Sequence, residues 1–236
     1  MTSLRSSAIP VSDPSAGLRI TEIFYSLQGE ANTAGLPTVF IRLTGCPLRC
    51  TYCDTTYSFE GGERRSLDEI IQTALDFKTP HICVTGGEPL AQPNALPLMQ
   101  RLADLGCEVS LETSGALDVS KVDARVSKVL DLKTPASGES ARNLLSNLDY
   151  LTAHDQIKFV ICSREDYEWS KQQVELHKLN EKAGTVWFSP AFAVEKGAAR
   201  LPQLARDLAQ WILEDRLPVR FQLQLHKLLW NDETGR

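Results

Sequence analysis

The stretch TVFIRLTGCPLRCTYCDTT (Thr38–Thr56) joins an apolar, β-branched run to a loop that holds three cysteines, Cys46, Cys50 and Cys53. The run Thr38–Leu43 predicts a buried β-strand that delivers the chain into the cysteine loop. Thiolates hold iron–sulfur clusters, and these spacings let one short loop wrap three corners of a cubane. Three ligands leave one iron of a [4Fe–4S] cluster open to an outside ligand, as a catalytic zinc keeps an open position.

Two alternative interpretations of the loop are a zinc knuckle with a fourth ligand elsewhere and a set of buried thiols. Core packing does not suit three cysteines in a loop that also contains Gly45 and Pro47, and we favour a cluster. The other three cysteines stand singly in apolar strand contexts, where free thiols are commonly buried: Cys83, Cys107 and Cys162.

Outward from this stretch, the sequence predicts strands that alternate with helices. Strands are expected at Arg19–Leu27, Thr38–Leu43, His81–Thr85, Cys107–Glu112, Lys128–Lys133, Gln156–Cys162, Thr185–Ser189 and Val219–Leu225. Helices are expected at Ser66–Phe77, which opens with a capping box, and at Ala95–Leu105, Ser140–Leu148, Glu165–Leu179 and Leu201–Glu214. The alternation predicts a single α/β domain with a parallel sheet and about six βα steps, either an open sheet or a partial barrel.

Polar, turn-forming motifs recur where the predicted strands end. They are GCPLRC, TGGEP (Thr85–Pro89), ETSG (Glu112–Gly115), DLKTP (Asp131–Pro135) and Ser189–Pro190. Ligands of parallel α/β folds bind at the carboxyl ends of the strands. We therefore expect these loops to converge on one site.

Composition excludes several classes of function. The 236 residues carry a net charge of −5, which gives no electrostatic case for nucleic acid or an anionic membrane as main partner. No apolar run approaches the about 20 residues that span a bilayer, and the N-terminus lacks the apolar segment of a secretory signal. We expect residues 1–17 to form a flexible tail and the protein to be cytoplasmic, where clustered cysteines bind metals or catalyse.

Two motifs together resemble the signature of the radical S-adenosylmethionine (SAM) superfamily. The first is C-x3-C-x2-C with Tyr52 before the last cysteine, and the second is TGGEP, each at the end of its predicted strand. TGGEP alone reads as an ordinary tight turn. The resemblance implies a partial (β/α)6 barrel of the TIM type, with a [4Fe–4S] cluster on the three cysteines and SAM on the fourth iron.

Flanking motifs narrow the resemblance to the 7-carboxy-7-deazaguanine synthase family. They are EIFYSLQGE (Glu22–Glu30), FIRLTGC (Phe40–Cys46), CDTTYS (Cys53–Ser58), LETSG (Leu111–Gly115), DLKTP and QLHK (Gln224–Lys227). The resemblance implies a radical SAM domain over residues 18–227 and a C-terminal extension over residues 228–236. It also implies a homodimer, and a flavodoxin or ferredoxin as reductant.

The implied reaction is a ring contraction in 7-deazapurine (queuosine) biosynthesis. It converts 6-carboxy-5,6,7,8-tetrahydropterin to 7-carboxy-7-deazaguanine with loss of ammonia, and Mg²⁺ assists. The hydrogen at C6 of the substrate is taken by a 5′-deoxyadenosyl radical derived from SAM. No catalytic side chain is implied beyond the cluster and the cofactor.

The resemblance assigns site residues position by position. Cofactor contacts are implied for Tyr52, Cys53, Asp54, Gly86, Gly87, Glu88, Gly115, Cys162, Ser163, Arg164, Ser189, Pro190, Ala191 and Phe192. Substrate contacts are implied for Leu27, Gln28, Gly29, Glu30, Arg42 and Thr113, and Mg²⁺ is expected on Thr55. Lys133 is expected to neutralise a carboxylate or to be solvated, and His226 to reach the substrate or to be structural.

The chemistry of the side chains supports some of these assignments independently of the resemblance. Gln28 and Glu30 match the donor and acceptor edge of a pterin, and Arg42 offers a fork for a carboxylate or a carbonyl. The alternatives are a surface role for Arg42 and a backbone-capping hydroxyl for Thr55. Ala31 stands where the family usually has glycine, which allows the backbone less freedom.

Two other functions compete with this one. A glycyl-radical activase shares the cysteine spacing but has no use for Gln28, Glu30 and Thr55. An electron-transfer or zinc-binding module without catalysis predicts a closed fourth ligand and no use for TGGEP.

Overall fold

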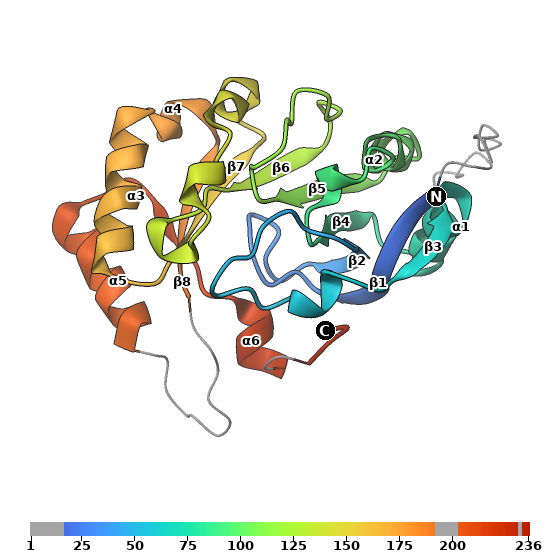
Figure 1. The fold of residues 1–236 in the computed structure, drawn as a ribbon, viewed down its shortest axis with the longest axis horizontal. Helices are drawn as coiled ribbons and strands as arrows, with labels where there is room; N and C mark the ends of the chain where they lie inside the picture. The colour runs from blue at the N-terminus through green and yellow to red at the C-terminus, as the bar shows by residue number, and fades with distance from the viewer. Residues whose placement is uncertain (1–16, 192–202, 231–232) are drawn as a thin grey trace, which may run out of the picture.

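The structure is a computed structural model that describes residues 17–191, 203–230 and 233–236. Its strands form one sheet in the order β3-β1-β2-β4-β5-β6-β7-β8-β9 (Figure 1). Their bounds are β1 Gly17–Leu27, β2 Pro37–Leu43, β3 Glu63–Ser66, β4 His81–Gly86, β5 Glu108–Thr113, β6 Ser127–Asp131, β7 Gln156–Ile161, β8 Thr185–Pro190 and β9 Arg220–Phe221. Because β3 and β9 remain the edges, the sheet is not closed, and the fold is a partial barrel.

The sheet is parallel from β2 to β9, as the alternation predicts. The expectation of a parallel sheet is wrong at its start, where β1 pairs antiparallel with both β2 and β3. A parallel crossover needs about a dozen residues or more, and the loop between Leu27 and Pro37 is shorter than that. The chain therefore turns back as an antiparallel pair, and β3 was not predicted at all.

Helices α1 to α5 cover the outer face of the sheet, and α6 lies apart from them (Figure 1). Their bounds are α1 Leu67–Asp76, α2 Ala95–Asp104, α3 Arg164–Leu176, α4 Leu179–Lys182, α5 Gln203–Asp215 and α6 Leu225–Trp230. The predicted capping box is present, since the Ser66 hydroxyl and the Glu69 carboxylate each accept from the other's backbone N–H. Figure 1 shows α3, α4 and α5 gathered around β7 and β8, and α1 and α2 at the opposite end of the sheet.

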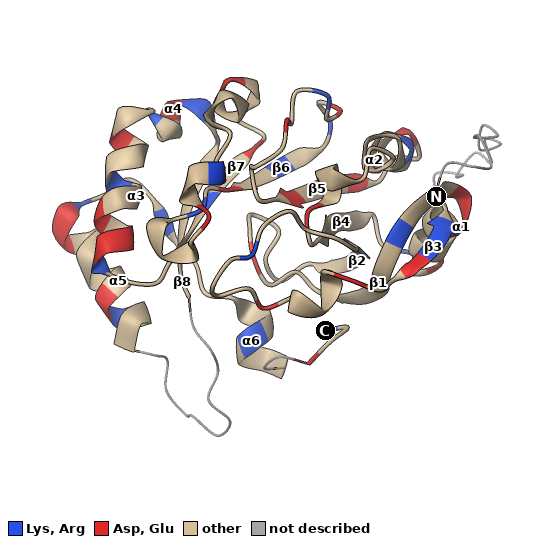
Figure 2. Ribbon diagram, viewed as in Figure 1, with Lys and Arg blue, Asp and Glu red and all other residues tan. Residues whose placement is uncertain are grey.

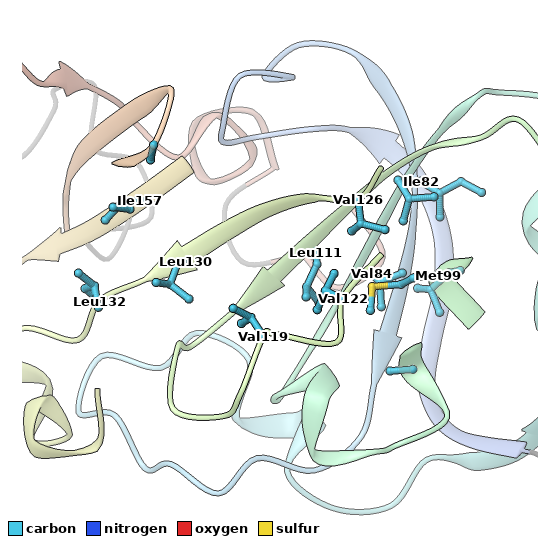
Figure 3. Close-up of a cluster of buried hydrophobic side chains, with 14 of the residues drawn as sticks. Ile82, Val84, Met99, Leu111, Val119, Val122, Val126, Leu130, Leu132 and Ile157 are labelled. Carbon is cyan, nitrogen blue, oxygen red and sulfur yellow. The ribbon is translucent and has the colours of Figure 1, made fainter. Parts of the chain in front are cut away.

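A single apolar core lies between the sheet and these helices. Ile82 and Val84 of β4, Leu111 of β5 and Met99 of α2 are all buried and belong to one cluster (Figure 3). Burying such side chains is the main favourable term in folding. None of the described helices is long and apolar enough to cross a membrane.

The predicted helix Ser140–Leu148 is wrong. That segment contains two short 3-10 turns, Ser140–Arg142 and Leu145–Tyr150. The amide of Asn147 is buried and bonds to the backbone of Val119, Gly115 and Leu117. Asparagine side chains that bond distant backbone groups compete with helix formation, which explains the irregular path.

Two further elements are shorter than predicted. The strand predicted for Val219–Leu225 is limited to β9, because the Leu225 N–H donates to Gly29 O (3.0 Å) and α6 begins there. The helix predicted for Glu165–Leu179 divides into α3 and α4 at Lys178, whose φ is +50°. A left-handed residue cannot continue a right-handed helix.

Candidate active site

A cavity of about 710 Å³ lies at the carboxyl ends of the parallel strands. It brings together these predicted site residues: Glu30, Arg42, Cys46, Cys50, Tyr52, Cys53, Asp54, Thr55, Gly86, Gly87, Thr113, Lys133 and Ala191. The cysteine, TGGEP, ETSG and DLKTP loops therefore converge on one site, as the sequence predicts. Residues that the sequence reasoning did not identify also line it, including Glu112, Asp131, Lys158 and Lys227.

The three cysteines of the loop are free, partly exposed thiols on the wall of this cavity. Burial raises the pKa of Cys46 and of Cys50, and the charge of Lys133 acts against that rise for both. Among the described residues no three His, Cys, Asp or Glu side chains lie close enough to hold a single metal ion. In a cubane each thiolate binds a different iron, so its ligands spread further apart than those of one ion. Three thiols of one loop on one cavity wall suit the three protein ligands of such a cluster.

TGGEP presses the end of β4 against the cysteine loop. The Gly87 and Glu88 N–H groups donate to Leu43 O (3.1 Å) and Gly45 O (2.8 Å). A Cβ on Gly86 would lie 2.3 Å from Leu43 O, and one on Gly87 would lie 2.2 Å from Gly45 O. Only glycine permits so close a contact between the two loops.

The side chain of Glu88 is buried and joins TGGEP to the end of β5. Its carboxylate accepts from the hydroxyl of Thr113 (2.9 Å), from the Ser114 N–H (2.7 Å) and from the Leu90 N–H (3.0 Å). The Glu88 carboxylate and the Thr113 hydroxyl thus satisfy each other, and they hold two strand ends together.

Arg42 lies in the cavity wall, and its side chain is 14% exposed, so it is not a surface residue of its strand; its contact with substrate stays a prediction. Its Nε donates to Glu22 Oε1 (2.7 Å), and its guanidinium stands over the rings of Phe24 (5.7 Å) and Tyr57 (5.9 Å). Burial lowers the pKa of Arg42, whereas the charges of Tyr57 and Glu22 raise it. The net effect is a raised pKa, so the guanidinium stays charged. This arrangement fixes the fork that a carboxylate or carbonyl would meet.

The loop after β1 presents Gln28 and Glu30 next to each other. Gln28 Oε1 accepts from the Glu30 N–H (3.2 Å), and Gln28 Nε2 donates to Glu112 Oε1 (3.4 Å). Glu30 Oε2 pairs with Lys158 Nζ (3.2 Å), whereas Glu30 Oε1 is buried and has no hydrogen-bond partner. This oxygen has room to accept a hydrogen bond from a ligand or from water.

Three lysines supply positive charge to the cavity. Lys133 pairs with Asp131 (3.0 Å), Lys158 with Glu30 and Asp131 (3.6 Å), and Lys227 with Asp54 (3.3 Å). The Lys133 side chain is 11% exposed, and its partner is a carboxylate of the protein itself. Figure 2 shows Lys and Arg next to Asp and Glu along the loops at the centre of the molecule.

A signal for Lys158 was present in the sequence. It is the single charged residue of the run QIKFVI, which forms β7 and is buried at all six positions. A lysine in a fully buried strand needs a partner.

Helix α6 brings the QLHK motif against the loop after β1. A Cβ on Gly29 would lie 2.2 Å from His226 Nδ1, so the histidine packs on this glycine. Lys227, and not His226, lines the cavity. The contact leaves no room for a side chain at position 29, so this position requires glycine.

Other predicted site residues do not line this cavity: Leu27, Gln28, Gly29, Glu88, Gly115, Cys162, Ser163, Arg164, Ser189 and Pro190. Arg164 stacks on Tyr167 (5.0 Å) and Trp211 (4.9 Å), and Ser163 caps α3 by accepting from the Asp166 N–H. Burial raises the pKa of the Cys162 thiol to about 12. Phe192 lies outside the described residues.

Comparison with known proteins agrees with this geometry. The family model described as the radical SAM superfamily matches residues 40–137. The chain is 45% identical over 223 residues to a 7-carboxy-7-deazaguanine synthase of Koribacter versatilis, covering 92% of this chain and 99% of that relative. It is 43% identical over 222 residues to a 7-carboxy-7-deazaguanine synthase of Chlorobaculum tepidum, covering 93% and 97%.

The crystal structure of QueE from Escherichia coli shares the fold, with a TM-score of 0.73 at 22% sequence identity, over 94% of this chain and 100% of that one. The identities over nearly whole chains show the family directly. The chain belongs to the 7-carboxy-7-deazaguanine synthase family of radical SAM enzymes.

Proposed function

We propose that this enzyme converts 6-carboxy-5,6,7,8-tetrahydropterin to 7-carboxy-7-deazaguanine with loss of ammonia, in 7-deazapurine biosynthesis. The observation that carries the proposal is that three free cysteines of one loop line the same cavity as Glu30 and Arg42. Cys46, Cys50 and Cys53 would hold the [4Fe–4S] cluster, and the backbone at Tyr52–Asp54 and Gly86–Gly87 would contact SAM. When bound, the [4Fe–4S] cluster and SAM together supply a carbon radical that removes hydrogen from the substrate.

The residues of the cavity suit a small, polar, anionic substrate. Glu30 Oε1, buried and without a partner, can accept from an N–H of the aminopyrimidinone ring. The charged fork of Arg42 can bind a carbonyl or the carboxylate. The apolar side chains of Leu48, Val129 and Val160 line the same cavity and suit the ring faces.

We assign Mg²⁺ to Thr55. Its hydroxyl lines the cavity and lies 3.8 Å from Cys53 Sγ, so a metal there would stand beside the cluster. Mg²⁺ keeps few protein ligands and relies on substrate oxygens and water. The substrate carboxylate would complete the shell.

The proposal includes a cytoplasmic homodimer that takes electrons from a flavodoxin or a ferredoxin, as the family resemblance implies. It also divides the chain into a tail (1–17), a radical SAM domain (18–227) and an extension (228–236). Helix α6 runs from Leu225 to Trp230, across the last of these boundaries.

Product identification tests the proposal. Protein reconstituted without oxygen should bind about four irons per chain, and with SAM, Mg²⁺ and a reductant it should turn the carboxypterin into the deazaguanine. Cys50→Ala should abolish turnover. A wild-type protein with a full cluster and no turnover of this pterin would contradict the assignment. Thr55→Ala should weaken the response to Mg²⁺, and an unchanged response would remove Thr55 from that role.

A further inference from the structure

Almost every charged side chain that lines the cavity has an oppositely charged partner in the protein. Each of four carries a cation–anion contact within 4.0 Å: Arg42 with Glu22, Lys133 with Asp131, Lys158 with Glu30 and Lys227 with Asp54. Among the described residues, Glu112 is the one acidic residue of the cavity wall without such an ion pair. Its carboxylate therefore has no direct cationic partner in the part of the chain that the structure describes.

The hydrogen bonds of Glu112 are few and long. Gln28 Nε2 donates to Oε1 at 3.4 Å, and the hydroxyl of Thr85 donates to Oε2 at 3.3 Å. Both distances lie beyond the usual range for such bonds. An ionised carboxylate accepts about four hydrogen bonds, so each oxygen of Glu112 keeps room for a further donor.

Nearby positive charge offsets only part of the effect that burial has on the Glu112 carboxylate. Burial raises the pKa of Glu112, and the nearby charge of Glu30 adds to that rise, whereas Lys158, Arg42 and His226 act in the opposite direction. Glu112 stands on β5 directly before Thr113, whose hydroxyl already donates to Glu88. Within the LETSG motif, Glu112 is thus the side chain with free capacity toward the cavity.

We infer that Glu112 is a further substrate-binding residue, whose carboxylate accepts hydrogen bonds from N–H groups of the ligand. The inference rests on the proposed function and deepens it. A tetrahydropterin presents N–H groups on both of its rings, and Glu30 alone offers one unpartnered oxygen to them. Gln28 links the Glu30 backbone to the Glu112 carboxylate, since its Oε1 accepts from the Glu30 N–H and its Nε2 donates to Glu112 Oε1. Glu30 and Glu112 therefore act as a pair that selects a donor-rich ring.

The test is the affinity of Glu112→Gln for 6-carboxy-5,6,7,8-tetrahydropterin. Titration calorimetry of the reconstituted, SAM-loaded enzyme without reductant measures binding in the absence of turnover. We expect the pterin affinity to fall about 10- to 100-fold, the size of a lost hydrogen bond to a charged group. We expect SAM affinity and iron content to stay unchanged.

The matched control is Glu108→Gln, the same substitution at the start of the same strand. The Glu108 side chain is 71% exposed and pairs with His81, away from the cavity. This variant should bind the pterin as the wild type does. Where Glu112→Gln does not fold, Glu112→Asp replaces it, because it keeps the charge and withdraws the oxygens by one carbon.

The outcomes separate the two hypotheses. Wild-type affinity in the folded Glu112 variant would overturn this inference alone. A wild-type enzyme that binds no pterin would overturn the proposed function and this inference with it. Loss of SAM affinity together with pterin affinity would also overturn the inference, because it would indicate a general distortion of the cavity.

Discussion

Lys158 of β7 and Glu30 of the loop after β1 form a buried ion pair, Nζ to Oε2 at 3.2 Å, across 128 residues of sequence. Both side chains are 9% exposed. The pair fastens the loop that carries Gln28 and Glu30 to the inside of the barrel. Asp131 Oδ2 lies 3.6 Å from the same Nζ, so one lysine holds two carboxylates of the cavity.

Removal of this lysine should destabilise the fold strongly. Lys158→Met leaves the buried Glu30 carboxylate without its partner, and breaking such a pair costs about 3–5 kcal/mol. Denaturation of the cluster-free protein measures the loss. In the double variant Lys158→Met, Glu30→Gln the loss should be smaller than the sum of the two single losses. A cost below about 1 kcal/mol for Lys158→Met, typical of exposed pairs, would contradict the buried geometry.

Ala31 should tolerate glycine. Its φ is +64°, a conformation that costs a residue with a Cβ about 1–2 kcal/mol, and its side chain is buried. Glycine loses more conformational entropy on folding than alanine, and the substitution also removes a buried methyl group. The relief of the backbone strain offsets these two losses. We expect Ala31→Gly to leave the free energy of unfolding unchanged or raise it by up to about 1 kcal/mol.

The control is Ala74→Gly, at an equally buried alanine inside α1. There the substitution should lower the free energy of unfolding by about 1 kcal/mol or more. Equal losses at the two positions would show that the conformation of Ala31 carries no strain.

Much of the fold and the outline of the site follow from the sequence, because they depend on local signals. Hydrophobic runs ending in TGGEP or ETSG mark strand ends, and strand ends share one edge of a parallel sheet. The error at Val219–Leu225 has a different origin. Its alternation of apolar and polar residues is typical of a strand, but the Leu225 N–H bonds to Gly29 O, about 200 residues earlier. Periodicity carries no information about such a partner.

The inner wall of the cavity could not be predicted for the same reason. Lys158 stands out in its apolar run, but its partners Glu30 and Asp131 come from other strands and loops. Glu112 lies in a motif that the sequence singled out, yet that motif suggested Thr113. Only the hydrogen bond from Thr113 to Glu88 shows that this hydroxyl is already engaged.

Gly87 should be essential for the cluster loop. A Cβ there would lie 2.2 Å from Gly45 O and 2.9 Å from the Cβ of Cys46, so Gly87→Ala must push the cysteine loop away from β4. We expect its iron content after reconstitution to fall to less than half of the wild-type value. The measurement is iron per chain together with the visible absorbance of the cluster.

Gly35→Ala is the matched control for Gly87→Ala. Gly35 has a φ of +89°, and a Cβ there would meet nothing within 4 Å. The Gly35→Ala variant should lose about 1 kcal/mol of stability through backbone strain and keep its iron binding intact. Full iron content in Gly87→Ala would show that the loop yields to the extra carbon without losing its ligands.

Asp215 should make the packing of α5 on α3 sensitive to acid. Its carboxylate accepts from Lys171 Nζ and from the hydroxyl of Tyr167, both at 2.7 Å, and these bonds lower its pKa below the usual value of 3.8. A carboxyl whose pKa is lower in the folded state stabilises the protein above its unfolded pKa, and that stabilisation is lost as pH falls through the folded pKa. Asp215→Asn removes the titration. We therefore expect the melting temperature of the cluster-free variant to lie below that of the wild type at pH 6 and the gap to narrow as pH falls below about 4. Melting curves from pH 3 to pH 7 measure this, and a gap that does not change with pH would mean that the charge of Asp215 contributes nothing to the contact between the two helices.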